Sequence, residues 1–215
     1  MAPYAPRMET PPHLDDRTMR QRMLAGDLYL ADDPELDEAS AVAQELMAAY
    51  NATDARQEPR RRDLLERLLG AVGEGTVLRP PLYVDYGTHL RIGARCFANF
   101  GLVALDVAPI TIGNDVQIGP NVQLLTPTHP VDPDLRRDKW EAAEPITLGD
   151  NVWLGGGAIV LAGVSIGDDT VVGAGAVVTR DLPANVVAVG NPARVVRTIG
   201  DAATGEAVID GTGRA

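Results

Sequence analysis

The chain shows two successive hydrophobic periods, a helical period followed by a six-residue period. Between residues 16 and 70, apolar positions recur every three or four residues, as on one face of an α-helix. Asp33 and Pro34 supply an N-cap acid followed by proline at the first helical position, and Gly70 supplies a stop signal. This segment is therefore predicted to form three short helices. The apolar residues expected on their faces are Met19, Met23, Leu24, Leu36, Ala39, Ala43, Leu46, Met47, Tyr50, Leu64, Leu65, Leu68 and Leu69.

After Gly70, an aliphatic residue recurs every six positions, and glycine often follows it directly. A small or β-branched residue comes four positions after each, as Val116 follows Ile112. This period fits one short strand plus one sharp turn, and three such units close a triangular coil of about eighteen residues. Residues 71–199 are therefore predicted to form a mainly β domain, a parallel β-helix of hexapeptide repeats. The aliphatic positions are Ile112, Ile118, Leu124, Leu148, Leu154, Val160, Ile166, Val172 and Val178.

Residues 127–145 break the six-residue period, because Pro130, Arg136 and Ala142 stand where aliphatic residues are due. We expect this segment to be a loop extruded from the β-helix. Long loops on a rigid scaffold commonly carry function, although a tolerated surface insertion is the alternative. Residues 1–15 and 200–215 are expected to be disordered tails.

Composition narrows the classes of partner. The net charge of the chain is −11, which argues against the basic face that nucleic-acid binding needs. The longest apolar run, Ala158 to Val164, is far shorter than the roughly 20 residues of a membrane helix, and residues 1–13 contain no apolar signal segment. Cys96 is the only cysteine, which excludes an intrachain disulfide, and its phase places it in the core. We therefore expect a cytoplasmic protein with no nucleic-acid or membrane partner.

Six short motifs are spread over most of the chain, and together they indicate a family more specifically than the six-residue repeat does. They are Met23-Leu24-Ala25-Gly26-Asp27-Leu28-Tyr29, Asp85-Tyr86-Gly87, Phe97-Ala98-Asn99-Phe100, Thr128-His129-Pro130-Val131-Asp132, Asn151-Val152-Trp153-Leu154-Gly155 and Gly190-Asn191-Pro192-Ala193-Arg194-Val195. Together they resemble the maltose and galactoside O-acetyltransferases of the hexapeptide-repeat superfamily. The resemblance implies a left-handed β-helix, a homotrimer with its sites between subunits, and transfer of an acetyl group from acetyl-CoA to a sugar hydroxyl. No metal is expected to be required.

Three histidines are available as a general base. His13 lies in the expected tail, and His89 is expected to be a solvated turn residue in an early coil. His129 opens the extruded loop between Pro127 and Pro130, which restrict its backbone. Acyl transfer from a thioester to a hydroxyl needs a base that works near neutral pH, as imidazole does. The resemblance gives this role to His129, and a purely structural loop histidine is the alternative.

The roles of the polar residues expected around His129 are less clearly assigned. The resemblance implies that Asn99 and Asp85 contact the acceptor, and Asp32 lies near a further acceptor-binding position. Asp134 is a possible orienting group for His129, but the sequence leaves open which carboxylate has that role.

Three arginines form a candidate donor site in an otherwise acidic chain. Arg180, Arg194 and Arg197 follow the last regular coils, where the phosphates of CoA would need cations. The resemblance places them at phosphate-binding positions, with arginine at 180 where lysine is usual. The alternative is that these arginines bind no ligand and are only solvated side chains at the C-terminal edge of the β-helix. Positions implied to line the pantetheine arm of CoA are Gly156, Ala174, Thr179 and, by packing along it, Trp153.

Other functions on the same repeat remain as alternatives. A hydratase like the gamma-class carbonic anhydrases needs three histidines on one metal, which the placement of His13 disfavours. A non-catalytic hexapeptide scaffold would release no CoA. Serine and chloramphenicol-like molecules are alternative acceptors, and the motif near Met23 favours sugars.

Overall fold

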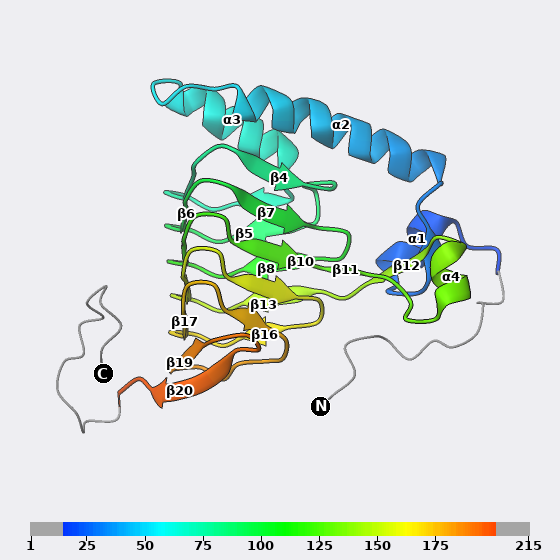
Figure 1. Ribbon diagram of the computed structural model, residues 1–215. Helices are drawn as coiled ribbons and strands as arrows, with labels where there is room; N and C mark the ends of the chain where they lie inside the picture. Colours follow the sequence, from blue (N-terminus) through cyan, green and yellow to red (C-terminus); the bar gives the residue numbers. More distant parts are fainter. Residues whose placement is uncertain (1–14, 201–215) are drawn as a thin grey trace.

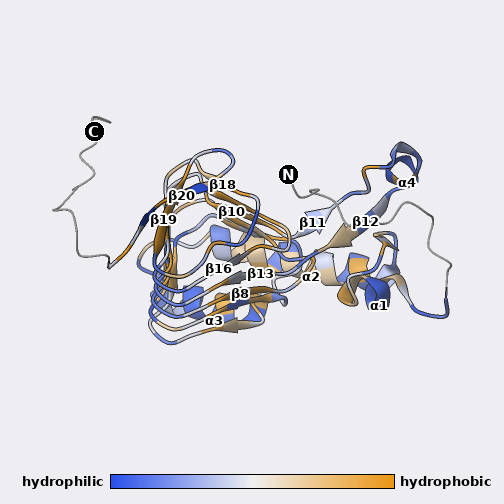
Figure 2. Cartoon of the chain, turned by 90° about the horizontal axis from the view of Figure 1, so that it is seen from below, coloured by the Kyte–Doolittle hydropathy of each residue, from blue (hydrophilic) through white to orange (hydrophobic). Residues whose placement is uncertain are grey.

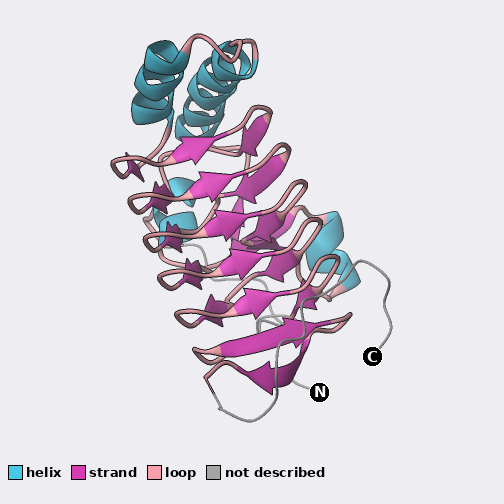
Figure 3. Cartoon of the chain, turned by 90° about the vertical axis from the view of Figure 1, so that its left-hand side faces the viewer, coloured by secondary structure: helices cyan, strands magenta, loops and turns pink. Residues whose placement is uncertain are grey.

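The structure, a computed structural model, describes residues 15–200 of the chain. Most of them form a parallel β-helix whose coils stack one above another, each passing through three short strands (Figure 3). Two helices lie across one end of the stack, and a small module of strands and short helices projects from one side (Figure 1). No helix within residues 15–200 is long and apolar enough to cross a membrane.

The strands form three faces of a prism. Face I contains β2 (Ala71–Val72), β5 (Leu90–Ile92), β8 (Ile110–Ile112), β13 (Ile146–Leu148) and β16 (Ser165–Ile166). Face II contains β3 (Val77–Leu78), β6 (Phe97–Ala98), β9 (Gln117–Ile118), β14 (Trp153–Leu154), β17 (Val171–Val172), β19 (Val186–Val189) and β20 (Arg194–Thr198). Face III contains β4 (Leu82–Val84), β7 (Leu102–Leu105), β10 (Gln123–Leu125), β15 (Ile159–Leu161) and β18 (Val177–Val178). The chain turns from face II to face III at edge II–III and from face III to face I at edge III–I.

The predicted aliphatic lattice forms the core of the prism. Leu124, Leu154 and Val160 are fully buried, and the other predicted aliphatic positions are at most 3% exposed. Each fully buried aliphatic side chain contributes roughly 1.5 to 3 kcal/mol. Cys96, at 3% exposure, lies in the same core, as expected. The prediction of a stacked hexapeptide β-helix is therefore confirmed.

The coils differ in length at one edge only. Leu90 pairs with Ile110, which gives an early coil of 20 residues, whereas Leu148 pairs with Ile166, which gives a later coil of 18. The additional residues lie at edge III–I, in corners 85–89 and 106–109, and the extruded loop leaves from the same edge after β10. These longer corners explain why the six-residue phase is irregular before Ile110.

Helices α2 (Pro34–Asn51) and α3 (Glu58–Leu68) cover the first coil (Figure 1). Tyr50 is fully buried, and its hydroxyl donates to the Leu78 carbonyl at 2.6 Å. The side chain of Asn51 exchanges two 2.8 Å hydrogen bonds with the Leu82 backbone. The predicted cap at Asp33 is confirmed, since its side chain accepts from the Glu35 amide. The helices therefore close the open end of the β-helix core.

The side module joins the start of the chain to the extruded loop. It contains α1 (Met19–Leu24), β1 (Tyr29–Leu30), β11 (Pro127–Thr128), α4 (Pro133–Arg137) and β12 (Trp140–Ala143). Its three strands form an antiparallel sheet in the order β1-β12-β11, set to one side of the prism (Figure 2). Segment 16–70 was expected to be helical throughout, but it contains a strand, because β1 finds its partner in the distant loop.

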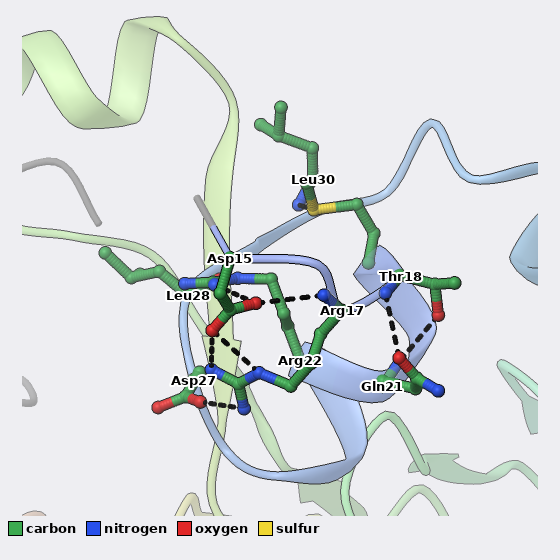
Figure 4. Close-up of polar contacts among 9 residues, drawn as sticks. Asp15, Arg17, Thr18, Gln21, Arg22, Asp27, Leu28 and Leu30 are labelled. Carbon is green, nitrogen blue, oxygen red and sulfur yellow. Dashed lines mark hydrogen bonds and ion pairs between the residues drawn. The ribbon is translucent and has the colours of Figure 1, made fainter. Parts of the chain in front are cut away.

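Two expectations at the start of the chain need correction. Leu24, expected on the buried stripe of α1, is 46% exposed, whereas Met23 is buried. Asp15, expected to belong to a disordered tail, accepts hydrogen bonds from Arg17, which lower the pKa of Asp15 to about 2 (Figure 4). The buried Arg22 lies 3.3 Å from Asp15, and its Nε donates to the Leu28 carbonyl. Residues 1–14 and 201–215 of the expected tails lie outside the described residues.

Candidate functional site

His129 lies where the extruded loop leaves the sheet of the side module. It follows β11 directly and is exposed, while the neighbouring Pro130 is buried. The antiparallel pairing of β11 with β12 fixes the backbone up to Thr128. His129 is therefore an accessible imidazole at the root of a structured hairpin.

A group of acids lies beside this hairpin at edge III–I. Asp85 opens corner 85–89 and is half-buried. Burial, together with the negative charges of Asp106 and Glu141, raises the pKa of Asp85 to about 6. Within residues 15–200, no hydrogen bond to the Asp85 carboxylate offsets this cost. Asp85 therefore offers a half-buried carboxylate close to β12 that accepts no hydrogen bond from the described residues.

Asp106 shapes this corner from beneath and was not singled out by sequence reasoning. It is fully buried and accepts hydrogen bonds from the backbone amides of Asp85, Tyr86 and His89 at 2.9 to 3.1 Å. Its only sequence signal is an acid inside the apolar run of Leu105 and Val107. Its carboxylate fixes the backbone that presents Asp85.

His89 departs from the expectation of a solvated turn residue. It is half-buried, its Nδ1 lies 2.8 Å from the Asp106 carbonyl, and its ring lies 5.5 Å from that of Tyr86. These contacts give His89 a structural role in the corner.

The remaining acceptor candidates lie in two different places. Asp32 is exposed and follows β1 in the side module. Asn99 follows β6 at edge II–III, where its Oδ1 accepts from the Phe100 amide at 2.9 Å. Asn99 is therefore on a different edge of the prism from His129 and Asp85.

One row of outward side chains on face II links Trp153 to Arg197. The strand register pairs Trp153 with Val171, Val171 with Val187, and Val187 with Arg197. Strands lie about 4.8 Å apart, so this row spans about 14 Å. Trp153 is 51% exposed. The row therefore offers an aromatic surface at one end and a cation at the other.

A β-bulge brings Arg194 and Arg197 onto the same side of β20. In a regular strand, residues three apart point to opposite faces. The register between β19 and β20 shifts by one residue, so that Arg194 pairs with Val189 and Arg197 with Val187. Val187 and Val189 share one face of β19, and therefore their two partners do as well.

The other donor candidates divide between the two edges. Gly156 and Ala174 lie at edge II–III, where the Gly156 carbonyl accepts from the Gly175 amide at 2.9 Å. Thr179 and Arg180 follow β18 and lie at edge III–I. Arg180, Arg194 and Arg197 are exposed, and none of them forms an ion pair within the described part of the chain.

Two cavities of the described chain lie away from these residues. One of about 630 Å³ lies between α2, α3 and the first coil, with Tyr50, Leu65 and Leu78 in its wall. Another of about 520 Å³ runs beside α2 and reaches Tyr86. Neither contains a predicted site residue. Across residues 15–200, no group of three or more His, Cys, Asp or Glu residues is arranged to hold a metal ion.

Comparison with known proteins identifies matches at both ends of the fold. Residues 22–73 match a family model described as a maltose acetyltransferase hexapeptide capping motif, and residues 145–180 match one described as bacterial transferase hexapeptide (six repeats). Nodulation protein L of Rhizobium meliloti is 47% identical over 83% of this chain and 98% of its own length. Galactoside O-acetyltransferase of Escherichia coli is 40% identical over 85% of this chain and 90% of its own length.

Two solved structures share the fold. A maltose O-acetyltransferase from Clostridium difficile is 41% identical, with a TM-score of 0.85 over 86% of this chain and 99% of that one. A galactoside acetyltransferase in complex with coenzyme A is 37% identical, with a TM-score of 0.83 over 86% of this chain and 93% of that one. These matches confirm the predicted left-handed parallel β-helix.

Proposed function

The chain belongs to the maltose and galactoside O-acetyltransferase family of hexapeptide-repeat acetyltransferases, and we propose that it moves the acetyl group of acetyl-CoA to a sugar hydroxyl with His129 as general base. One observation carries this proposal: an accessible imidazole at the root of the loop lies on the same edge as the half-buried carboxylate of Asp85. A base and a hydrogen-bond acceptor for hydroxyl groups thus converge at edge III–I.

The proposed reaction needs one proton carrier. The neutral imidazole of His129 removes the proton from the acceptor hydroxyl as its oxygen attacks the thioester carbonyl. The carbon–sulfur bond then breaks, and the imidazolium returns the proton to the departing CoA thiolate. The products are the acetyl ester and CoA, the base is regenerated, and no step requires a metal ion.

Asp85, Asn99 and Asp32 are the proposed acceptor contacts. A carboxylate accepts hydrogen bonds only, and sugar hydroxyls are donors that match it. The buried Asp106 supports Asp85 through its backbone amide, at 3.0 Å. Acceptor hydroxyls would therefore give the Asp85 carboxylate hydrogen bonds that the described residues do not supply.

The donor is proposed to bind along face II and its edges. Arg194 and Arg197 share one side of β20, which suits the phosphates of CoA, and Trp153 on the same face offers a surface for the pantetheine arm. Gly156 and Ala174 would meet that arm at edge II–III. Thr179 and Arg180 lie at edge III–I and are proposed to contact the donor there.

The division of these residues over two edges supports a homotrimer. Asn99, Gly156 and Ala174 lie at edge II–III, whereas His129 and Asp85 lie at edge III–I. Packing face II of one subunit against face III of the next would bring the two edges together. A cyclic trimer closes this heterologous contact, and each site would then be shared by two subunits.

A panel of acceptors tests the proposal. Maltose, glucose, a galactoside, serine and chloramphenicol would each be incubated with acetyl-CoA while released thiol is measured. We expect release that depends on a sugar. Thiol release with serine or chloramphenicol alone would move the assignment to those acceptors, and no release with any of them would support the scaffold alternative.

A further inference from the structure

The hairpin of the side module places a carboxylate opposite the proposed base. β11 and β12 pair Pro127 with Ala143 and Thr128 with Ala142. One further step of this antiparallel register, beyond the last paired residue Thr128, would set His129 opposite Glu141. Cα atoms of facing residues in such a pair lie about 4.5 to 5.5 Å apart. Thr128 and Ala142 are both buried, whereas His129 is exposed and Glu141 half-buried. By strand alternation, His129 and Glu141 therefore share the opposite face of the sheet.

A side chain from β1, the third strand of the same sheet, holds Glu141 in place. β1 pairs with β12 so that Tyr29 faces Glu141, and the Tyr29 hydroxyl donates to Glu141 Oε2 at 2.8 Å. Tyr29 is 1% exposed. Burial and the charge of Glu141 hold the pKa of Tyr29 far above its usual range, so that it remains a hydrogen-bond donor. Glu141 is thus fixed from one side by a rigid partner.

Two other acids of the loop are engaged elsewhere. Asp134 accepts from Arg137 at 2.6 Å, and its side chain is 77% exposed. Asp132 caps α4 by accepting from the Asp134 and Leu135 amides. Neither carboxylate is fixed toward His129, whereas continuing the register of β11 and β12 by one residue places Glu141 across from it.

We propose that Glu141 is the positioning residue that orients His129, and that Tyr29 holds Glu141 in place for this purpose. The inference rests on the proposed role of His129 as base. A carboxylate beside an imidazole fixes the ring and stabilises the imidazolium formed when the base takes a proton. Asp85 and Tyr86, from the first corner, are the other titratable groups whose ionisation responds to Glu141.

This arrangement gives the start of the chain a role in catalysis. Tyr29 belongs to the segment of α1 and β1, which is held by the buried Arg22 through the Leu28 carbonyl (Figure 4). The row runs from Tyr29 on β1 to Glu141 on β12 and, continued one residue past the end of β11, reaches His129. The segment around β1 is therefore part of the support of the base.

Glu141→Gln tests the proposal, with Glu144→Gln as matched control. Glu144 is exposed and lies just beyond the end of β12. We expect kcat of the Glu141→Gln variant to fall about tenfold or more, since hydrogen bonds to charged groups are typically worth that much. Loss of the negative charge disfavours the imidazolium, so the acidic limb of its kcat/KM profile should move to lower pH. Glu144→Gln should keep the wild-type rate and profile.

Tyr29→Phe tests the contact between Tyr29 and Glu141, because phenylalanine fills the same buried volume without the hydroxyl. We expect a smaller fall in kcat, with little change in the KM for acetyl-CoA. In a Glu141→Gln background the same substitution should have no further effect, because residues that act through one partner are not additive. Additive losses in the double variant would overturn the role of Tyr29.

The variants also separate this inference from the proposed function. If His129→Ala abolishes turnover but Glu141→Gln behaves like Glu144→Gln in both rate and pH profile, the positioning role is wrong and the base assignment stands. If His129→Ala retains activity, the base assignment itself fails. Supporting the inference requires the loss in kcat and the shift of the acidic limb together.

Discussion

The imidazole of His129 is the residue on which the proposed chemistry depends most directly. We expect His129→Ala to lower kcat by at least about a hundredfold, since general-base catalysis typically contributes 10² to 10⁴. The wild-type rate should rise with pH as the base loses its proton, and this limb should vanish in the variant. Steady-state kinetics over a pH series measures both effects.

Binding and assembly serve as controls for the His129 variant. The side chain is exposed and lies outside the β-helix core, so affinity for CoA and oligomeric state should be unchanged. Retention of more than about a tenth of wild-type kcat, or loss of activity only through dissociation of subunits, would give His129 a structural role.

The raised pKa of Asp85 predicts that the free energy of unfolding depends on pH. Because its pKa is raised to about 6 in the folded protein, its ionisation destabilises the fold as pH rises from about 4 to 6, and the penalty stays constant above that. Asp85→Asn should therefore stabilise the protein by about 1 to 2 kcal/mol near pH 7.5 and by little near pH 4, after allowance for partial exposure.

Thermal unfolding at these two pH values measures the effect of Asp85→Asn. Asp138→Asn, at an exposed loop position, is the control and should show no such difference. Equal effects of Asp85→Asn at both pH values would mean that the Asp85 carboxylate is not strained by burial. The same variant should raise the KM for the acceptor, which links the cost in stability to the proposed binding role.

At the scale of the element, the β-bulge between β19 and β20 places Arg194 and Arg197 on the same side of the strand. Because Arg194 and Arg197 share one side, their joint replacement by alanine should raise the KM for acetyl-CoA at least about tenfold, with a much smaller change for the acceptor. Initial rates with each substrate varied in turn make this measurement.

Arg60→Ala is a suitable control for the arginines, since Arg60 is exposed on α3 at the opposite end of the β-helix. It removes one positive charge without touching face II. Equal changes in both KM values for the Arg194 and Arg197 variant, or a comparable effect of Arg60→Ala, would contradict the donor assignment.

At the scale of the whole molecule, the three faces differ in their outward rows. Face I presents Ala71, Arg91, Thr111, Thr147 and Ser165. Face II presents Val77, Phe97, Gln117, Trp153, Val171, Val187 and Arg197. Face III presents Tyr83, Val103, Gln123, Ile159 and Val177. Faces II and III are thus mostly apolar and face I is polar, as expected if the first two are covered by neighbouring subunits.

Light scattering should accordingly find a trimer at micromolar concentration. Ile159→Glu on face III should dissociate it and abolish activity, because a buried, unpaired charge is costly. Thr111→Glu on face I should leave both unchanged. A wild-type monomer that is fully active would overturn both the trimer and the shared site.

The sequence by itself determined the repetitive part of this protein. The columns through Ile118, Leu154 and Val172 follow from a strict six-residue period, since a coil closes only when inward positions repeat at each corner. The start of α2 was equally predictable, because Asp33 and Pro34 act on local backbone geometry. Family motifs added the candidates His129, Asp85 and Arg194.

Only the tertiary structure decided how these residues meet. The strand β1, the contact of Tyr29 with Glu141, and the support of Asp85 by Asp106 depend on contacts between segments far apart in the chain, which no local period encodes. The common side of Arg194 and Arg197 depends on a single register shift against β19. Local patterns repeat because each coil solves the same packing problem, whereas the site arises where the chain departs from the repeat and long-range pairing sets the geometry.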